Sequence, residues 1–269
     1  RDLHSFPTRR SSDLAALLRI ETRGAVLTVG LNRPAKRNAL NDGIILALRD
    51  CFSAIPEEIG AVVIHGVGDH FSSGLDLSEL TERDATEGLV HSQMWHRVFD
   101  RIQYCRVPVI AALKGAVIGG GLELACAAHI RVAEPSAYFA LPEGQRGIFV
   151  GGGGSVRLPR LIGVPRMADM MLTGRVYSAT EGSAYGFSQY LTEAEGALPK
   201  ALELAERVAA NAPLTNFAVL QALPMIAEAN PQTGLLMESL MATVAQSDKE
   251  AKKRIRAFLD RKTAKVKPT

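Results

Sequence analysis

Short apolar runs bounded by turn residues dominate the chain up to about residue 165. Runs of this length that are rich in β-branched side chains predict strands that are largely buried. We expect two such strands within 17–31, with a turn at Arg23 and Gly24, and others at 61–65, 107–113, 130–133 and 137–140.

Helical periodicity alternates with these strands. Asn38 or Asn41 can cap a helix that runs to about residue 55, and residues 89–103 place apolar side chains on roughly one helical face. Two more helices are expected at 122–128 and from the glycine run 151–154 to about residue 161. Alternating strands and helices favour an α/β layer architecture.

The pattern changes at Arg166. Helical segments then follow one another, with Pro213 and Pro231 between some of them, at about 166–172, 179–185, 197–211, 215–228, 232–246 and 248–261. The chain is therefore expected to combine an α/β core, residues 15–196, with an all-helical C-terminal region, residues 197–269.

Composition narrows the class of protein. The 269 residues are 47% hydrophobic and 22% charged, which is enough apolar material for a large core. A net charge of +3 spread along the chain does not call for a nucleic acid or an anionic membrane. The apolar runs are too short or too glycine-rich for a bilayer span, which needs about 20 residues.

Two features bear on location and processing. Cys51, Cys105 and Cys126 are odd in number and far apart, so we expect reduced thiols and a cytoplasmic protein. Residues 1–14, RDLHSFPTRRSSDL, lack an apolar stretch and helical periodicity, and their aspartates argue against a transit peptide. We interpret this leader as foreign to the fold and expect it to be disordered.

Several chemistries are absent from the sequence. There is no GxxxxGK[ST], so the glycine runs are not a nucleoside-triphosphate loop. Gly66 and Gly68 follow a predicted strand, but Phe71 stands where a dinucleotide fingerprint needs its third glycine. No serine has glycines two positions before and after it, which excludes a nucleophile elbow. His91 and His96 are five positions apart, so they do not share a helix face for a metal.

Glycine turns and two glutamates remain as candidate chemistry. Gly119–Gly121 precede a predicted helix that carries Glu123, and the free N–H groups of a first helical turn suit a developing negative charge. A tight turn or close packing explains these glycines equally well. A glycine turn at 73–74 could add a second donor to one oxyanion. Glu143, a solvated loop residue if taken alone, follows a strand, and two carboxylates beside such a clamp could hold one water as base and acid.

In order and spacing, these motifs resemble the crotonase (enoyl-CoA hydratase/isomerase) superfamily from about residue 17 to the C-terminus. The matching segments are Asn32-Arg33-Pro34, Asn38-Ala39-Leu40, Phe71-Ser72-Ser73-Gly74-Leu75-Asp76-Leu77, Gly119-Gly120-Gly121-Leu122-Glu123, Pro142-Glu143 and the run from Gly151. The resemblance implies an α/β fold, a crotonase-like spiral of ββα units in two stacked sheets. It also implies a C-terminal helical region that trimerises, with two trimers often forming a hexamer.

The resemblance further implies roles for individual residues. Glu123 and Glu143 fall on the catalytic positions, and the backbone N–H groups of Leu75 and Gly120 would form the oxyanion hole for the thioester carbonyl. No cofactor is implied, because coenzyme A is part of the substrate. Candidates for substrate binding are Lys36, Arg37, Ser73, Gly74, Asp76, Leu77, Gly119, Pro142 and Gly151, with Lys36 and Arg37 equally well explained as a solvated basic turn.

Having both carboxylates favours hydration of a trans-2-enoyl-CoA to a 3-hydroxyacyl-CoA. A double-bond isomerase, which needs chiefly Glu143, and a hydratase-lyase for hydroxycinnamoyl thioesters stay open, as do an RNA-binding homologue and an inactive assembly subunit. We expect an acyl-CoA substrate and a homotrimer or hexamer, with no nucleic-acid or membrane partner. Trp95 could line an aryl pocket, but its helical stripe favours core packing.

Overall fold

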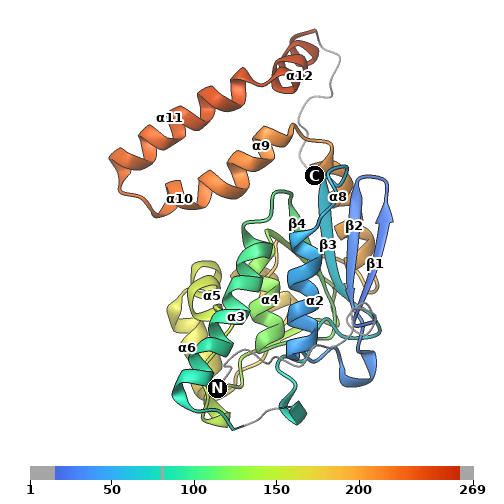
Figure 1. Ribbon diagram of the computed structural model, residues 1–269, viewed down its shortest axis with the longest axis vertical. Helices are drawn as coiled ribbons and strands as arrows, with labels where there is room; N and C mark the ends of the chain where they lie inside the picture. The colour runs from blue at the N-terminus through green and yellow to red at the C-terminus, as the bar shows by residue number, and fades with distance from the viewer. Residues whose placement is uncertain (1–15, 80–81, 261–269) are drawn as a thin grey trace, which may run out of the picture.

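The computed structural model describes residues 16–79 and 82–260, and its largest sheet has six strands in the order β1-β2-β3-β4-β6-β9 (Figure 1). These strands are β1 (Leu18–Arg23), β2 (Val26–Leu31), β3 (Ala61–Gly66), β4 (Val109–Leu113), β6 (Ile130–Ala133) and β9 (Tyr190–Leu191). β1 pairs with β2 in antiparallel fashion, and every later pair is parallel. The predicted strands at 61–65, 107–113 and 130–133 are confirmed.

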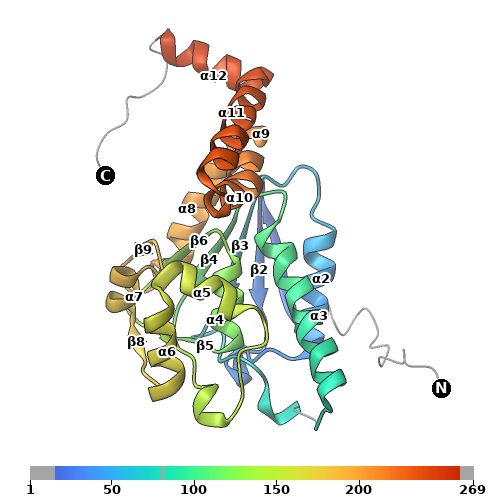
Figure 2. The ribbon, with the colours of Figure 1, turned by 90° about the vertical axis from the view of Figure 1, so that its left-hand side faces the viewer.

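Helices cover both faces of this sheet, which explains why β2 and β4 consist of buried residues throughout. The helices α2 (Asp42–Ser53) and α3 (Ala85–Gln103) lie on one side, and α8 (Ala197–Ala209) lies on the other (Figure 2). Leu204 of α8 packs in one cluster with Val63 and Ile110 of the sheet. Therefore α8, expected from the sequence to begin the C-terminal region, packs on the core sheet instead.

A second sheet has three strands, and one of them leads directly into the glycine turn at Gly119–Gly121. Its order is β5 (Ala116–Ile118), β7 (Tyr138–Ala140) and β8 (Tyr177–Ser178). The sequence predicted β7 but neither β5 nor β8. After β5 the chain enters α4 (Gly120–Ala127) directly, so the helix begins at Gly120 rather than Leu122 as expected, and the first N–H groups of α4 belong to the glycines.

Local capping fixes where the two helices in front of the main sheet begin. Of the two predicted candidates, Asn38 and Asn41, it is Asn41 whose side chain accepts a hydrogen bond from the Ile44 N–H at the start of α2. At the start of α3, Asp84 and Glu87 form a reciprocal capping box. The remaining helices of the body are α5 (Gly154–Ile162), α6 (Val164–Thr173) and α7 (Ala179–Tyr185).

The last helices form an arm that projects from the body (Figures 1 and 2). It contains α9 (Pro213–Phe217), a π-helical turn at Ala218–Ala222, α10 (Leu223–Glu228), α11 (Pro231–Ser247) and α12 (Lys249–Leu259). The helical segment expected at about 215–228 is confirmed, and a π-helical turn lies within it.

Among the described residues, no helix combines the length and the apolar character that crossing a membrane requires. The predicted leader, residues 1–14, lies outside the described residues.

Candidate active site

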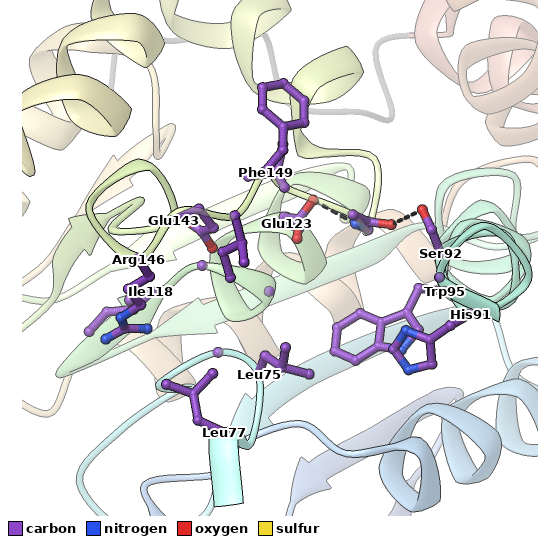
Figure 3. A pocket seen from close by; sticks show the side chains of 18 of the residues that line it. Leu75, Leu77, His91, Ser92, Trp95, Ile118, Glu123, Glu143, Arg146 and Phe149 are labelled. Carbon is purple, nitrogen blue, oxygen red and sulfur yellow. Dashed lines mark hydrogen bonds between the residues drawn. The ribbon is translucent and has the colours of Figure 1, made fainter. Parts of the chain in front are cut away.

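A cavity of about 400 Å³ lies between α3, the β5–α4 junction and the segment that joins β7 to α5. Most of its wall is apolar, from side chains such as Leu75, Ile118 and Val150, and polar groups enter at only a few places. Figure 3 shows Glu123 and Glu143 side by side at its centre, with Leu75 facing them. A small number of polar groups in an apolar concavity is typical of a ligand site.

Glu123 lies in the first turn of α4 and is only 4% exposed. Its Oε1 accepts hydrogen bonds from the backbone N–H groups of Gly152 and Gly154, both at 2.8 Å. Burial raises the pKa of Glu123, and these two hydrogen bonds partly oppose the shift. A Cβ on Gly154 would lie 2.8 Å from Glu123 Cγ, so only glycine allows this close approach.

Glu143 directly follows Leu141-Pro142 after β7 and is 8% exposed. Its buried Oε2 has no hydrogen-bond partner among the residues that the structure describes. Burial raises the pKa of Glu143 to about 7, and the nearby charge of Glu123 adds to that shift. Gly119, at φ +51°, makes room for this carboxylate, because a Cβ there would lie 2.5 Å from Glu143 Oε1.

The two glutamates are therefore suited to move protons near neutral pH. A general acid or base works best when its pKa is near the working pH, and Glu143 meets that condition. Glu123 keeps one oxygen engaged by backbone donors, which leaves Oε2 for a ligand. The charge of Glu123 raises the pKa of Glu143, so the titrations of the two carboxylates are coupled.

Two backbone amides face the same space as the carboxylates. Leu40 pairs with the neighbours of Leu75, donating to Gly74 O at 2.7 Å and accepting from Asp76 N at 2.8 Å. The Leu75 N–H therefore points to the opposite side of its strand, and within the described chain it donates no hydrogen bond. The Gly120 N–H starts α4 and has no partner inside the helix. A Cβ on Gly120 would lie 3.6 Å from the Leu75 nitrogen, so the two amides are neighbours that could clamp one oxyanion.

Asp76 braces the loop that carries Leu75. Its carboxylate accepts hydrogen bonds from Arg33 at 2.8 Å and Lys36 at 3.1 Å, and from both the N–H and the hydroxyl of Ser78. Burial alone would raise the pKa of Asp76, but the hydrogen bonds from Ser78, Lys36 and Arg33 outweigh it and hold the pKa well below its usual range. The carboxylate therefore stays ionised and ties the loop to the segment at 33–36.

The structure gathers most of the predicted site residues at one cavity. Those that line it are Ser73, Gly74, Leu75, Leu77, Gly119, Gly120, Glu123, Glu143 and Gly151. The other four, Lys36, Arg37, Asp76 and Pro142, do not line this cavity. Lys36 and Asp76 bind each other instead, because a buried carboxylate requires a cation.

Apart from Trp95, for which a pocket role was weighed against core packing, sequence reasoning missed the contributions of α3 and its flanking residues to this wall. The Ser92 hydroxyl donates to Gly151 O at 2.7 Å and so holds the glycine segment against the helix. Arg83, His91 and Arg146 also line the cavity. Trp95 is buried against Phe99, with ring centroids 5.7 Å apart. It also lines the cavity, so one side chain serves both the apolar stripe of α3 and the cavity wall.

The described residues contain no candidate metal site, since no three His, Cys, Asp or Glu side chains gather around one point. The three cysteines are free thiols. Burial raises the pKa of Cys126 to about 11, which makes its thiol unreactive at neutral pH. Among the groups that line the cavity, the carboxylates of Glu123 and Glu143 and the backbone amides of Leu75 and Gly120 are the candidates for chemistry.

Comparison with known proteins gives a consistent picture. A family model described as enoyl-CoA hydratase/isomerase matches residues 21–268. The 2,3-dehydroadipyl-CoA hydratase of Escherichia coli is 35% identical over 90% of this chain and 95% of its own length. The short-chain-enoyl-CoA hydratase of Clostridium acetobutylicum is 31% identical over 90% and 94%. A crystal structure of a candidate enoyl-CoA hydratase from Rhodopseudomonas palustris is 83% identical, covers 93% of this chain and 97% of its own, and superposes with a TM-score of 0.90.

Proposed function

Because the chain belongs to the enoyl-CoA hydratase/isomerase family, we propose that it adds water to a trans-2-enoyl-CoA and forms a 3-hydroxyacyl-CoA. The observation that carries this proposal is the presence of two buried glutamates, Glu123 and Glu143, at one cavity beside two free backbone amides. Water addition needs a base for the water and an acid for carbon, and two coupled carboxylates supply both.

In the proposed reaction, the thioester carbonyl accepts hydrogen bonds from the N–H groups of Leu75 and Gly120. The water oxygen bonds to C3, and the electron pair of the double bond moves through C2 towards the carbonyl oxygen. The ionised member of the Glu123–Glu143 pair takes the proton that water releases. The protonated member gives its proton to C2, so the pair begins and ends with one proton. The two amides stabilise the negative charge that develops on oxygen.

The proposal is tested by incubating the purified protein with crotonyl-CoA and cinnamoyl-CoA while the enoyl absorbance is followed. We expect the absorbance of crotonyl-CoA to fall and 3-hydroxybutyryl-CoA to form. Release of an aldehyde from a hydroxycinnamoyl thioester would favour a hydratase-lyase. An unchanged spectrum with every enoyl thioester would contradict an enzymatic role and leave the binding or assembly alternatives.

Isomerisation is the second candidate, and the unpartnered Oε2 of Glu143 favours it. A carboxylate with a free oxygen could take a proton from C2 of a 3-enoyl thioester and return it at C4. That reaction does not need Glu123. The two candidates therefore differ in whether Glu123 is essential.

We also propose that the C-terminal arm assembles subunits. Many of its large apolar side chains are exposed in the single chain, namely Phe217, Val219, Leu223, Met225, Leu235, Leu236, Leu240, Val244, Ile255, Phe258 and Leu259. Many large apolar side chains exposed on one short region indicate a surface that another protein covers. The trimer or hexamer implied by the sequence resemblance would cover it.

Light scattering at micromolar concentration is expected to give a mass above that of one chain. Replacing Leu236 and Leu240 with arginine should shift the protein towards the monomer, because buried charges without partners oppose association. Gln246→Arg, at an exposed polar position of the same helix, is the matched control. A stable wild-type monomer would refute the assembly proposal.

A further inference from the structure

Two arginines line the otherwise mostly apolar cavity, and neither has its hydrogen-bonding capacity used. Within residues 16–79 and 82–260, the guanidinium groups of Arg83 and Arg146 donate no hydrogen bond, although both line the cavity. The nearest anion to Arg83 is Asp42, at 3.8 Å, and Asp42 is itself bound to His91 at 2.7 Å. The Arg83 side chain is only 26% exposed, so its donors are partly withdrawn from water.

The two arginines belong to opposite ends of the cavity. Figure 3 shows Arg146 beside Ile118 at one end and His91 beside Trp95 at the other, with the glutamates between them. Arg83 belongs to the His91 end, because both residues face the carboxylate of Asp42. The cavity therefore has a cation at each end of the space in which the substrate would lie.

The Ile118 end is the basic end. Ile118 donates its N–H to Ser72 O at 3.1 Å, which places it beside the segment at 72–74. Ser73 in turn donates its N–H to Arg37 O and its hydroxyl to Lys36 O. The backbone of Lys36 and Arg37 thus lies beside this end and Arg146 lines it, so the phosphates of coenzyme A would find positive charge here. With the thioester carbonyl at Leu75 and Gly120, the acyl chain then extends towards the His91 end and meets Arg83.

We propose that Arg83 binds a carboxylate at the far end of the acyl chain, so that the substrate is the coenzyme A monothioester of an unsaturated dicarboxylic acid. This inference rests on the proposed function and narrows its substrate class. A carboxylate matches the planar fork of a guanidinium that lacks an acceptor. A neutral alkyl end would displace water from Arg83 without replacing its hydrogen bonds, which disfavours such chains.

The test compares hex-2-enedioyl-CoA, which carries a free carboxylate, with neutral hex-2-enoyl-CoA. We expect the wild type to have the higher kcat/KM for the carboxylated thioester. Arg83→Met should lower the ratio of the two kcat/KM values by at least about tenfold, since a hydrogen bond to a charged group contributes on that scale. Arg97→Met, an exposed position of α3 outside the cavity, is the matched control and should keep the ratio.

Calorimetric binding of the saturated pair, hexanedioyl-CoA and hexanoyl-CoA, separates this inference from the proposed reaction. A preference for hexanedioyl-CoA that Arg83→Met removes would support the acyl-group assignment even if no thioester were hydrated. Equal affinities and equal kcat/KM values in the wild type would overturn it. So would an Arg83→Met variant that weakens both thioesters equally, because that result would place a coenzyme A phosphate at Arg83.

Discussion

Glu123→Gln and Glu143→Gln are each expected to lower kcat for enoyl-CoA hydration by at least about 100-fold, because each substitution removes one of the two proton-transfer groups. The amide of glutamine has nearly the shape of a carboxylate. At position 123 its oxygen can still accept the N–H groups of Gly152 and Gly154, so the glycine segment should stay in place. The measurement is kcat on the best enoyl thioester, with circular dichroism to verify folding.

Glu134→Gln is the matched control for this pair. Glu134 is a buried carboxylate that accepts a hydrogen bond from Ser136, and it does not line the cavity. We expect the control to keep near-wild-type turnover. If Glu123→Gln or Glu143→Gln also kept it, the paired-carboxylate mechanism would be wrong.

The pH dependence of the wild type follows from the same two residues. Burial raises the pKa of both glutamates, that of Glu143 to about 7. One member must be ionised and the other protonated, so kcat/KM should show a bell-shaped profile with limbs that belong to the coupled pair. The profile lies at higher pH than ordinary glutamates would give, because both shifts are upward.

Leu75→Pro is expected to lower kcat by about 100- to 1000-fold, the range found when one oxyanion donor is removed. Proline deletes the N–H itself. Because this N–H donates no hydrogen bond within the described chain, its loss removes no internal contact of the fold. The effect should therefore appear in catalysis far more than in the free energy of unfolding.

Leu75→Ala provides the comparison, since it keeps the backbone donor and shortens the side chain. Steady-state kinetics should give a much smaller loss for Leu75→Ala than for Leu75→Pro. Equal turnover by the two variants, with thermal unfolding showing both folded, would exclude the Leu75 amide from the oxyanion hole.

The central strands of the main sheet could be predicted because a strand buried on both faces is a run of consecutive apolar residues. Residues 61–64 and Val109–Leu113 are apolar runs in a parallel sheet covered on both faces. The two-residue strands β8 and β9 could not, since each is defined only by pairing with a partner that is distant along the chain. The π-helical turn at Ala218–Ala222 was not predicted either. Pro224, which has no N–H to donate to the preceding turn, was a local signal of irregular helical hydrogen bonding.

In the candidate site, too, some residues could be identified from the sequence, whereas their long-range contacts could not. Glu123, Glu143 and the two glycine turns could be singled out because their order along the chain matches a family pattern. The partners of charged side chains could not, as Lys36 and Asp76 illustrate, because their pairing joins residues forty positions apart. Ser92 likewise reaches Gly151 across 59 positions, a contact that depends on how α3 lies over the sheet.

The central claim is that one water adds across the double bond, and it is tested most directly by running the reaction in deuterated water with 2-enoyl and 3-enoyl thioesters. The account predicts a 3-hydroxyacyl-CoA from the 2-enoyl thioester, with deuterium at C2 and with hydroxyl and deuterium delivered stereospecifically. An enzyme that used Glu143 alone would instead prefer the 3-enoyl thioester and leave label at C4. Label found only at C4, with no 3-hydroxyacyl product, would contradict the hydratase assignment.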